Sequence, residues 1–268
     1  MNESLDQALK FHKNGNLDKA EKIYLNILKK NSTDASLLQL LGTLNLQKKN
    51  YKISEDYFLK SLELKPEDPV TLNNLGILNR NLDNIDKSIE YFEKNIKKNN
   101  FLNSWINKSN ILIKKNNYLE GLEFTKLALK NYPDNNKLKN NLALFLFECG
   151  FKKKALSIYE EFNSKKLHFE ESLINYSNIL IKTNNFDGAL EVLNEILFYN
   201  KNNIEALRSR SFIFKEKSDF KNAQNDLLLA IKIDASNLDN HKILVELYFD
   251  YKEYQLAIDY CDKMISKN

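Results

Sequence analysis

Small residues recur through this sequence in two registers with a period of about 34 residues, and a fixed period of this length is the signature of a repeat architecture. The first register holds Ala8, Gly42, Gly76, Ser109, Ala143, Ser177, Ser211 and Val245, and the second holds Ala20, Ser54, Ser88, Gly121, Ala155, Ala189, Ala223 and Ala257. Every step has the same length except the third, which is shorter by a single residue. Two helices approach closely only where small residues face each other. The pattern therefore predicts a series of helix pairs, each crossing at one small–small contact.

The segment 35–68 shows the complete unit. Large apolar side chains are expected on either side of the small residues Gly42 and Ser54, from Leu38, Leu41 and Phe58. Pro66 ends the second helix, because proline lacks an N–H donor and clashes with the preceding turn. Counted from Ala35, this spacing resembles the tetratricopeptide repeat, which consists of a helix, a turn and a second helix in about 34 residues.

Eight copies of this unit cover the chain. They span residues 1–34, 35–68, 69–101, 102–135, 136–169, 170–203, 204–237 and 238–268. The resemblance implies an all-α fold, a right-handed α-solenoid superhelix of eight helix-turn-helix units. Because each unit of such an array contacts its neighbours, residues 1–268 are expected to form one array without a domain boundary.

Three repeats depart from the pattern. Position 10 is Lys10 in repeat 1 but apolar in repeats 2 to 8, which predicts that repeat 1 is an N-terminal cap. In repeat 5, Lys152 replaces an aromatic residue, and the polar stretch from Asn163 to Lys166 is expected to end the second helix early. Repeat 8 carries apolar residues with no further unit to cover them, namely Tyr254, Ile258 and Ile265. The chain is then either the front part of a longer one, or docks there on a partner or a second copy.

Composition excludes several classes of function. The net charge is +4, from 40 basic and 36 acidic residues that are interleaved, whereas nucleic-acid binders gather their cations on one face. The longest apolar run, about 142–147, is too short to span a membrane. The polar N-terminus is unlike a secretory signal. Cys149 and Cys261 lie far apart and fit free thiols in a reducing compartment, so the protein is expected in the cytoplasm.

The sequence predicts no enzyme, no cofactor and no metal. Its histidines, His12, His168 and His241, are scattered over three repeats. It contains no glycine-rich phosphate loop, nucleophile elbow or zinc-protease spacing. Its carboxylates lie at positions that are expected on the solvent-exposed faces of the repeats, so they are not expected to act as general acids or bases.

The predicted binding site is a row of asparagines. In a superhelix of this kind the first helices line an inner groove, and position 6 of repeats 3 to 6 is occupied by Asn74, Asn107, Asn141 and Asn175. Further groove amides are Asn73, Asn110, Asn140 and Asn178. An amide offers both a donor and an acceptor, so such a row could hold the backbone of an extended polypeptide. The row resembles the asparagine ladder in the tetratricopeptide arm of protein O-GlcNAc transferase. These side chains are expected to be solvent-exposed and replaceable by alanine without loss of stability.

The expected function is therefore a protein–protein interaction scaffold that binds an extended polypeptide. The lysine and arginine residues with which chaperone-binding tetratricopeptide domains hold a carboxylate are missing from the middle of the groove. Three alternatives stay open. The amides could merely solvate the groove, or the chain could self-associate through repeat 8 as a structural protein. It could also be the substrate-recognition arm of a larger glycosyl- or sulfotransferase, because residues 15–24 resemble bacterial proteins of that layout.

Overall fold

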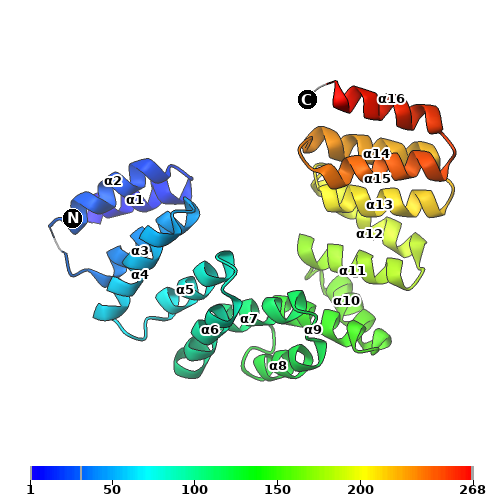
Figure 1. The fold of residues 1–268 in the computed structure, drawn as a ribbon. Helices are drawn as coiled ribbons and strands as arrows, with labels where there is room; N and C mark the ends of the chain where they lie inside the picture. Colours follow the sequence, from blue (N-terminus) through cyan, green and yellow to red (C-terminus); the bar gives the residue numbers. More distant parts are fainter. Residues whose placement is uncertain (1, 31, 267–268) are drawn as a thin grey trace. The chain divides into compact units, whose positions relative to one another are not determined.

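The computed structural model describes residues 2–30 and 32–266, and its regular structure is entirely helical over these ranges (Figure 1). The first helices of the repeats are α1 (Asn2–Lys13), α3 (Ala35–Gln47), α5 (Pro69–Asn81), α7 (Leu102–Lys114), α9 (Asn136–Glu148), α11 (Glu170–Lys182), α13 (Ile204–Glu216) and α15 (Leu238–Asp250). The second helices are α2 (Leu17–Leu28), α4 (Tyr51–Leu64), α6 (Ile85–Asn99), α8 (Tyr118–Asn131), α10 (Lys152–Lys165), α12 (Phe186–Tyr199), α14 (Phe220–Ile233) and α16 (Tyr254–Ile265). None of these described helices has the length and apolar character that crossing a membrane requires.

The turn between the two helices of each repeat confirms the predicted frame. Position 15 has a positive φ angle in every repeat, between 56° and 88°. The residues are Gly15, Lys49, Asp83, Asn116, Gly150, Asn184, Ser218 and Lys252, which reproduce the constant step of the small residues and its single shorter exception. The left-handed conformation turns the chain back within three residues, as in the αL caps that end many helices. The eight helix-turn-helix units are thus present as predicted.

The chain divides into two compact units, residues 1–141 and 142–268. Within the first unit, each second helix packs against the first helix of the next repeat, as α4 does against α5 and α6 against α7. First helices of neighbouring repeats also contact each other, α3 with α5 and α5 with α7. The second unit repeats this arrangement in α12 with α13, α14 with α15 and α11 with α13. First helices of neighbouring repeats therefore lie side by side from α3 to α7 in the first unit, and α11 lies beside α13 in the second.

The small residues form the helix crossings that the sequence predicts. Both registers are buried, apart from the partly exposed Val245. In repeats 2 and 3 the serine of the second helix donates a hydrogen bond across the crossing, from Ser54 Oγ to the Gly42 carbonyl oxygen (2.8 Å) and from Ser88 Oγ to that of Gly76 (2.7 Å). A hydroxyl that bonds to the facing helix requires the two backbones to lie close together. This contact fixes where each pair of helices crosses.

Position 10 is buried in every repeat after the first. Its apolar residues are at most 3% exposed, namely Leu44, Leu78, Ile111, Phe145, Ile179, Ile213 and Leu247. Lys10 is exposed. The sequence pattern at this position therefore predicted correctly which of these side chains are buried.

Repeat 5 corrects one expectation. The helix α10 does not end early, because it extends to Lys165 and has 14 residues, as many as α8 and α12. The polar stretch beginning at Asn163 is helical, since Asn, Ser and Lys on an exposed face cost a helix only a fraction of a kcal/mol each, roughly 0.5 or less. The residue after the helix, Lys166, adopts a left-handed conformation with φ 52°, as Asn100 does after α6 with φ 45°.

Replacing Gly42 with alanine should destabilise the protein. An added Cβ would lie 2.5 Å from the ring of Phe58, which covers the crossing in repeat 2. Overpacking of this kind costs roughly 1–3 kcal/mol. Alanine recovers about 1 kcal/mol through its better helix propensity. We expect a net loss of stability in urea unfolding of Gly42→Ala, and the same for Gly76→Ala, where Phe92 lies equally close.

The control is Gly188→Ala in α12, where the added Cβ would meet only the exposed side chain of Asn185 at 3.0 Å. This variant should be neutral or slightly stabilised. A smaller partner, Phe58→Leu, should partly restore a chain that carries Gly42→Ala. Equal stability of the Gly42→Ala and Gly188→Ala variants would show that the helix crossing can accommodate a Cβ atom at position 42.

Candidate functional site

The position-6 asparagines lie on first helices, as predicted. Asn74 is on α5, Asn107 on α7 and Asn141 on α9, all within the first unit, whereas Asn175 lies on α11 in the second unit. Because α3, α5 and α7 contact one another in sequence, the amides of the first unit follow the row of first helices. We refer to Asn74, Asn107 and Asn141 as the amide row.

Each member of the amide row is hydrogen-bonded to the preceding repeat. Asn74 Nδ2 donates to Thr43 Oγ1 (3.0 Å), Asn107 Nδ2 to Asn73 Oδ1 (3.0 Å) and Asn141 Nδ2 to Asn110 Oδ1 (2.6 Å). The amides therefore link repeats 2 to 5 along one face. Sequence reasoning missed the role of Thr43, which continues this set of bonds into repeat 2. The sequence did contain a signal for this role, because a polar residue stands 31 positions before both Asn74 and Asn141, and in each case it accepts the hydrogen bond.

These bonds fix the direction of the amide groups. Thr43 is held as an acceptor, because its hydroxyl donates to the Gln39 carbonyl oxygen (2.9 Å). The Nδ2 groups of Asn74 and Asn107 thus point toward the preceding repeat. No described group donates to the Oδ1 atom of either residue. Two acceptor oxygens, one per repeat, are consequently left for a ligand that donates hydrogen bonds.

The expectation that the four position-6 asparagines are solvent-exposed is wrong for Asn141, and two of the further groove amides, Asn73 and Asn140, are buried as well. Asn140 is 0% exposed, Asn141 2% and Asn73 6%. Asn73 accepts bonds from Asn107 and Ser104, and Asn141 also donates to Ser109 Oγ (3.1 Å). These three side chains form polar contacts between packed helices. Their amides cannot all be removed without loss of stability.

The remaining predicted residues are half-buried. Asn74, Asn107 and Asn110 keep part of their surface open in the first unit, as do Asn175 and Asn178 on α11 in the second. The residue 31 positions before Asn175 is Leu144, so the arrangement that orients Asn74 and Asn141 is not repeated there.

A basic pocket adjoins the amide row. It has a volume of about 580 Å³ and is lined by Asn110 together with Arg80, Lys114 and Lys115. Asp83 also lines it, and Lys115 Nζ lies 3.6 Å from Asp86 Oδ1, so the three cations outnumber the two nearby acids by one. The sequence pattern did not indicate this cluster, because its cations belong to two different repeats. The pocket places positive charge beside an otherwise neutral row.

The basic residues on the first helices of the second unit are largely neutralised. Lys215 Nζ lies 2.9 Å from Asp250 Oδ2, and this hydrogen bond raises the pKa of Lys215. Lys242 lies 3.8 Å from Glu246. Arg208 and Lys215 line a pocket of about 230 Å³ that also contains Glu246. Binding a carboxylate requires cations without acidic groups beside them, and the cations described here have acidic neighbours.

The histidines and cysteines are not assembled into a metal centre within the described ranges. No group of three or more His, Cys, Asp or Glu side chains there is arranged to hold a metal ion. Cys149 and Cys261 are free thiols, and Cys261 is exposed.

Comparison with known families finds the tetratricopeptide repeat model matching residues 35–68 and 70–97, which are repeats 2 and most of 3. Tetratricopeptide repeat protein 21B of Xenopus laevis is 33% identical over 99 residues, or 36% of this chain. The match covers only 7% of that relative's length.

Solved structures extend the similarity to nearly the whole chain. A tetratricopeptide repeat protein from Parabacteroides merdae superposes with a TM-score of 0.75 at 14% identity, covering 92% of this chain and 98% of that one. The chain has the tetratricopeptide repeat fold. The Cut9–Hcn1 hetero-tetramer of APC/C is similarly close, with a TM-score of 0.74 at 14% identity over 90% of this chain and 48% of that one. Pseudomonas aeruginosa PilF gives a TM-score of 0.62 at 16% identity over 79% of this chain and 97% of that one.

Replacing Asn141 with alanine should destabilise the first unit. The change removes a buried donor that serves both Ser109 and Asn110. A buried partner left without its hydrogen bond costs about 1–3 kcal/mol. We expect a loss of that size in urea unfolding. The matched control is Asn103→Ala on α7, because Asn103 is exposed and its replacement should leave stability within about 0.5 kcal/mol of wild type. Equal stability of the two variants would contradict a structural role for Asn141.

Proposed function

We propose that this chain is a binding scaffold that holds a partner polypeptide in an extended conformation along the first helices of its first unit. The site is the exposed part of the amide row, Asn74 and Asn107. The tetratricopeptide fold supports binding rather than catalysis, because it stacks helices into an extended surface.

The observation that carries the proposal is the fixed direction of these two amides. The donors Nδ2 are used by Thr43 and Asn73, and the acceptors Oδ1 are left without a described donor. The natural complement is a series of N–H donors, which an extended polypeptide backbone supplies whatever its sequence. Recognition through the backbone gives affinity without strict sequence specificity.

Half-buried isoleucines accompany the amides on the same helices. Ile77 lies on α5, and Ile106 and Ile113 on α7. They provide apolar surface for alternate side chains of an extended ligand, which point to opposite sides of its backbone. The basic pocket at Arg80 and Lys114 would favour an acidic side chain at one place along the ligand. The proposed ligand is therefore an extended segment that combines apolar and acidic residues.

Removing both exposed amides should weaken binding while leaving the fold intact. The variant Asn74→Ala/Asn107→Ala loses two acceptors, each contributing about 0.5–1.5 kcal/mol. We expect roughly a 5- to 150-fold loss of affinity for a partner captured by the wild-type chain. The measurement is a pull-down from cell extract, followed by a titration of the captured partner with both proteins.

The control variant for this titration is Asn26→Ala/Asn103→Ala, which removes two exposed helical asparagines elsewhere in the first unit. It should bind like wild type. Titrations at low and moderate salt distinguish the amides from the basic pocket, since screening weakens charge pairs far more than neutral hydrogen bonds. Binding that survives the loss of both amides but disappears with salt would place recognition at Arg80 and Lys114 instead.

We further propose self-association through repeat 8. On α16, Tyr254 is 52% exposed, Ile258 53% and Ile265 74%. Burying an apolar side chain contributes about 1.5–3 kcal/mol, so three in one patch could support a contact between two copies.

The wild-type chain should therefore show a rising average mass with concentration in light scattering. The variant Tyr254→Lys/Ile258→Lys/Ile265→Glu should remain monomeric, because its charges oppose burial of the patch. A wild-type chain that stays monomeric up to about 1 mM, where a contact of roughly 4 kcal/mol would be half occupied, contradicts self-association.

A further inference from the structure

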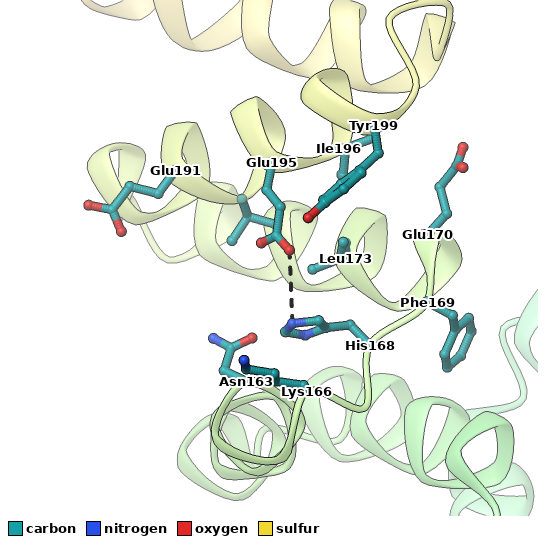
Figure 2. Close-up of a pocket in the computed structure, with 11 residues that line it drawn as sticks. Asn163, Lys166, His168, Phe169, Glu170, Leu173, Glu191, Glu195, Ile196 and Tyr199 are labelled. Carbon is teal, nitrogen blue, oxygen red and sulfur yellow. Dashed lines mark ion pairs between the residues drawn. The ribbon is translucent and has the colours of Figure 1, made fainter.

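A second pocket lies within the second unit. It has a volume of about 750 Å³ and is bounded by the end of α10, the segment 166–169, the start of α11 and one face of α12 (Figure 2). None of the residues that the amide row comprises lines it. It is therefore a separate candidate site.

The end of α10 forms one side of the pocket. The second helices α4, α8, α12 and α14 end in residues with φ between −133° and −136°, whereas α6 and α10 end in the left-handed residues Asn100 and Lys166. After α10, Lys166 is left-handed, and the chain turns so that His168 faces Glu195 of α12, as Figure 2 shows. His168 Nε2 and Glu195 Oε1 lie 4.0 Å apart, too far for a hydrogen bond. The carboxylate therefore keeps its hydrogen-bonding capacity.

The floor of the pocket is apolar. Leu173 of α11 and Val192 and Ile196 of α12 line it, and each is at most 8% exposed. Tyr199, at 79% exposure, extends over one side of the pocket toward Leu173 (Figure 2). An alkyl chain lying between the ring and the floor would exclude water from both. The pocket thus has room for the stem of a long side chain.

Negative charge is in excess around the pocket, because three carboxylates line it (Glu170, Glu191 and Glu195) together with one lysine, Lys166. Glu191 and Glu195 lie one helical turn apart, and within the described part of the chain neither has a hydrogen bond or ion pair to lysine or arginine. Nearby carboxylates are paired, as in Glu148–Lys182 (2.6 Å) and Glu161–Lys165 (2.9 Å). Two carboxylates on one helix face repel each other, and a shared cation would relieve this repulsion.

We propose that this pocket binds an arginine side chain of a partner polypeptide. Its guanidinium would meet Glu195 and Glu191, and its methylene stem would lie on Val192 and Ile196. Arginine fits better than lysine because the planar guanidinium bonds to two carboxylate oxygens at once and stacks on aromatic rings such as that of Tyr199. A metal ion is a poorer occupant, because no metal-holding cluster occurs among the described side chains.

The experiment is a methyl NMR titration of the full chain with Nα-acetyl-arginine methylamide. Methyl signals of Leu173, Val192 and Ile196 should shift, whereas those of Leu37 and Leu41 in repeat 2 should not. The citrulline analogue has the same shape without the charge and should bind at least about tenfold more weakly, since charged hydrogen bonds are roughly twice as strong as neutral ones.

The variant Glu191→Gln/Glu195→Gln should lower affinity for the arginine probe by a similar factor. Its control, Glu63→Gln/Glu90→Gln, removes the same charge from exposed positions in the first unit and should bind like wild type. The proposal is overturned if arginine and citrulline probes bind equally, if both double variants behave alike, or if no floor methyl shifts up to about 50 mM probe, a concentration at which even binding weaker than about 2 kcal/mol would be visible. Because the readout lies in the second unit, failure here leaves the amide row untouched.

Discussion

The close crossing of two helices at small residues is the contact on which the rest of this structure depends. Gly42 and Ser54 let α3 and α4 approach until a serine hydroxyl bonds to the facing backbone, and Phe58 covers the glycine. This contact fixes both the position and the rotation of the first helix. The rotation of the helix decides which of its positions are buried against the preceding repeat, such as Leu44, and which remain at the surface. A surface pattern that recurs once per repeat follows from a crossing that recurs once per repeat.

The amide row combines packing between repeats with the recognition that we propose for it. Asn141 is buried and ties two repeats, whereas Asn74 and Asn107 make the same kind of bond at the edge of the solvent. In these two, the inter-repeat bond uses the donor end of the amide and leaves the acceptor end outward. The structural bond therefore determines the polarity of the surface. An unrestrained asparagine could rotate to meet either a donor or an acceptor.

Much of the fold could be predicted from the sequence, because its signals are local and repeated. The regular step of the repeats predicted the start of every first helix from Ala35 onward, and the apolar residues at position 10 predicted buried side chains in repeats 2 to 8. The site was less predictable. Burial of Asn141 and the bond from Asn74 to Thr43 depend on how neighbouring repeats pack, and a pattern within one repeat does not contain that information.

Repeat 5 also shows where prediction from the sequence fails. Its polar residues suggested a shortened helix, yet α10 has the usual length, and the departure lies in the backbone of Lys166. Lysine has no special preference for the left-handed conformation, so the residue type gave no warning of the turn. That turn forms one side of the pocket beside Glu195. Features that arise from backbone conformation after a helix end are the ones that composition and periodicity miss.

The most direct test of the account is backbone ester scanning of a bound partner segment. Each ester replaces one peptide N–H of the ligand with an oxygen and leaves its side chains unchanged. If Asn74 and Asn107 accept hydrogen bonds from the backbone, esters at the ligand residues that face them should weaken binding about three- to tenfold, since one hydrogen bond contributes about 0.5–1.5 kcal/mol. Esters at the remaining residues should have little effect. A segment that binds equally well with an ester at every position would contradict the account, because its recognition could not then depend on backbone donors.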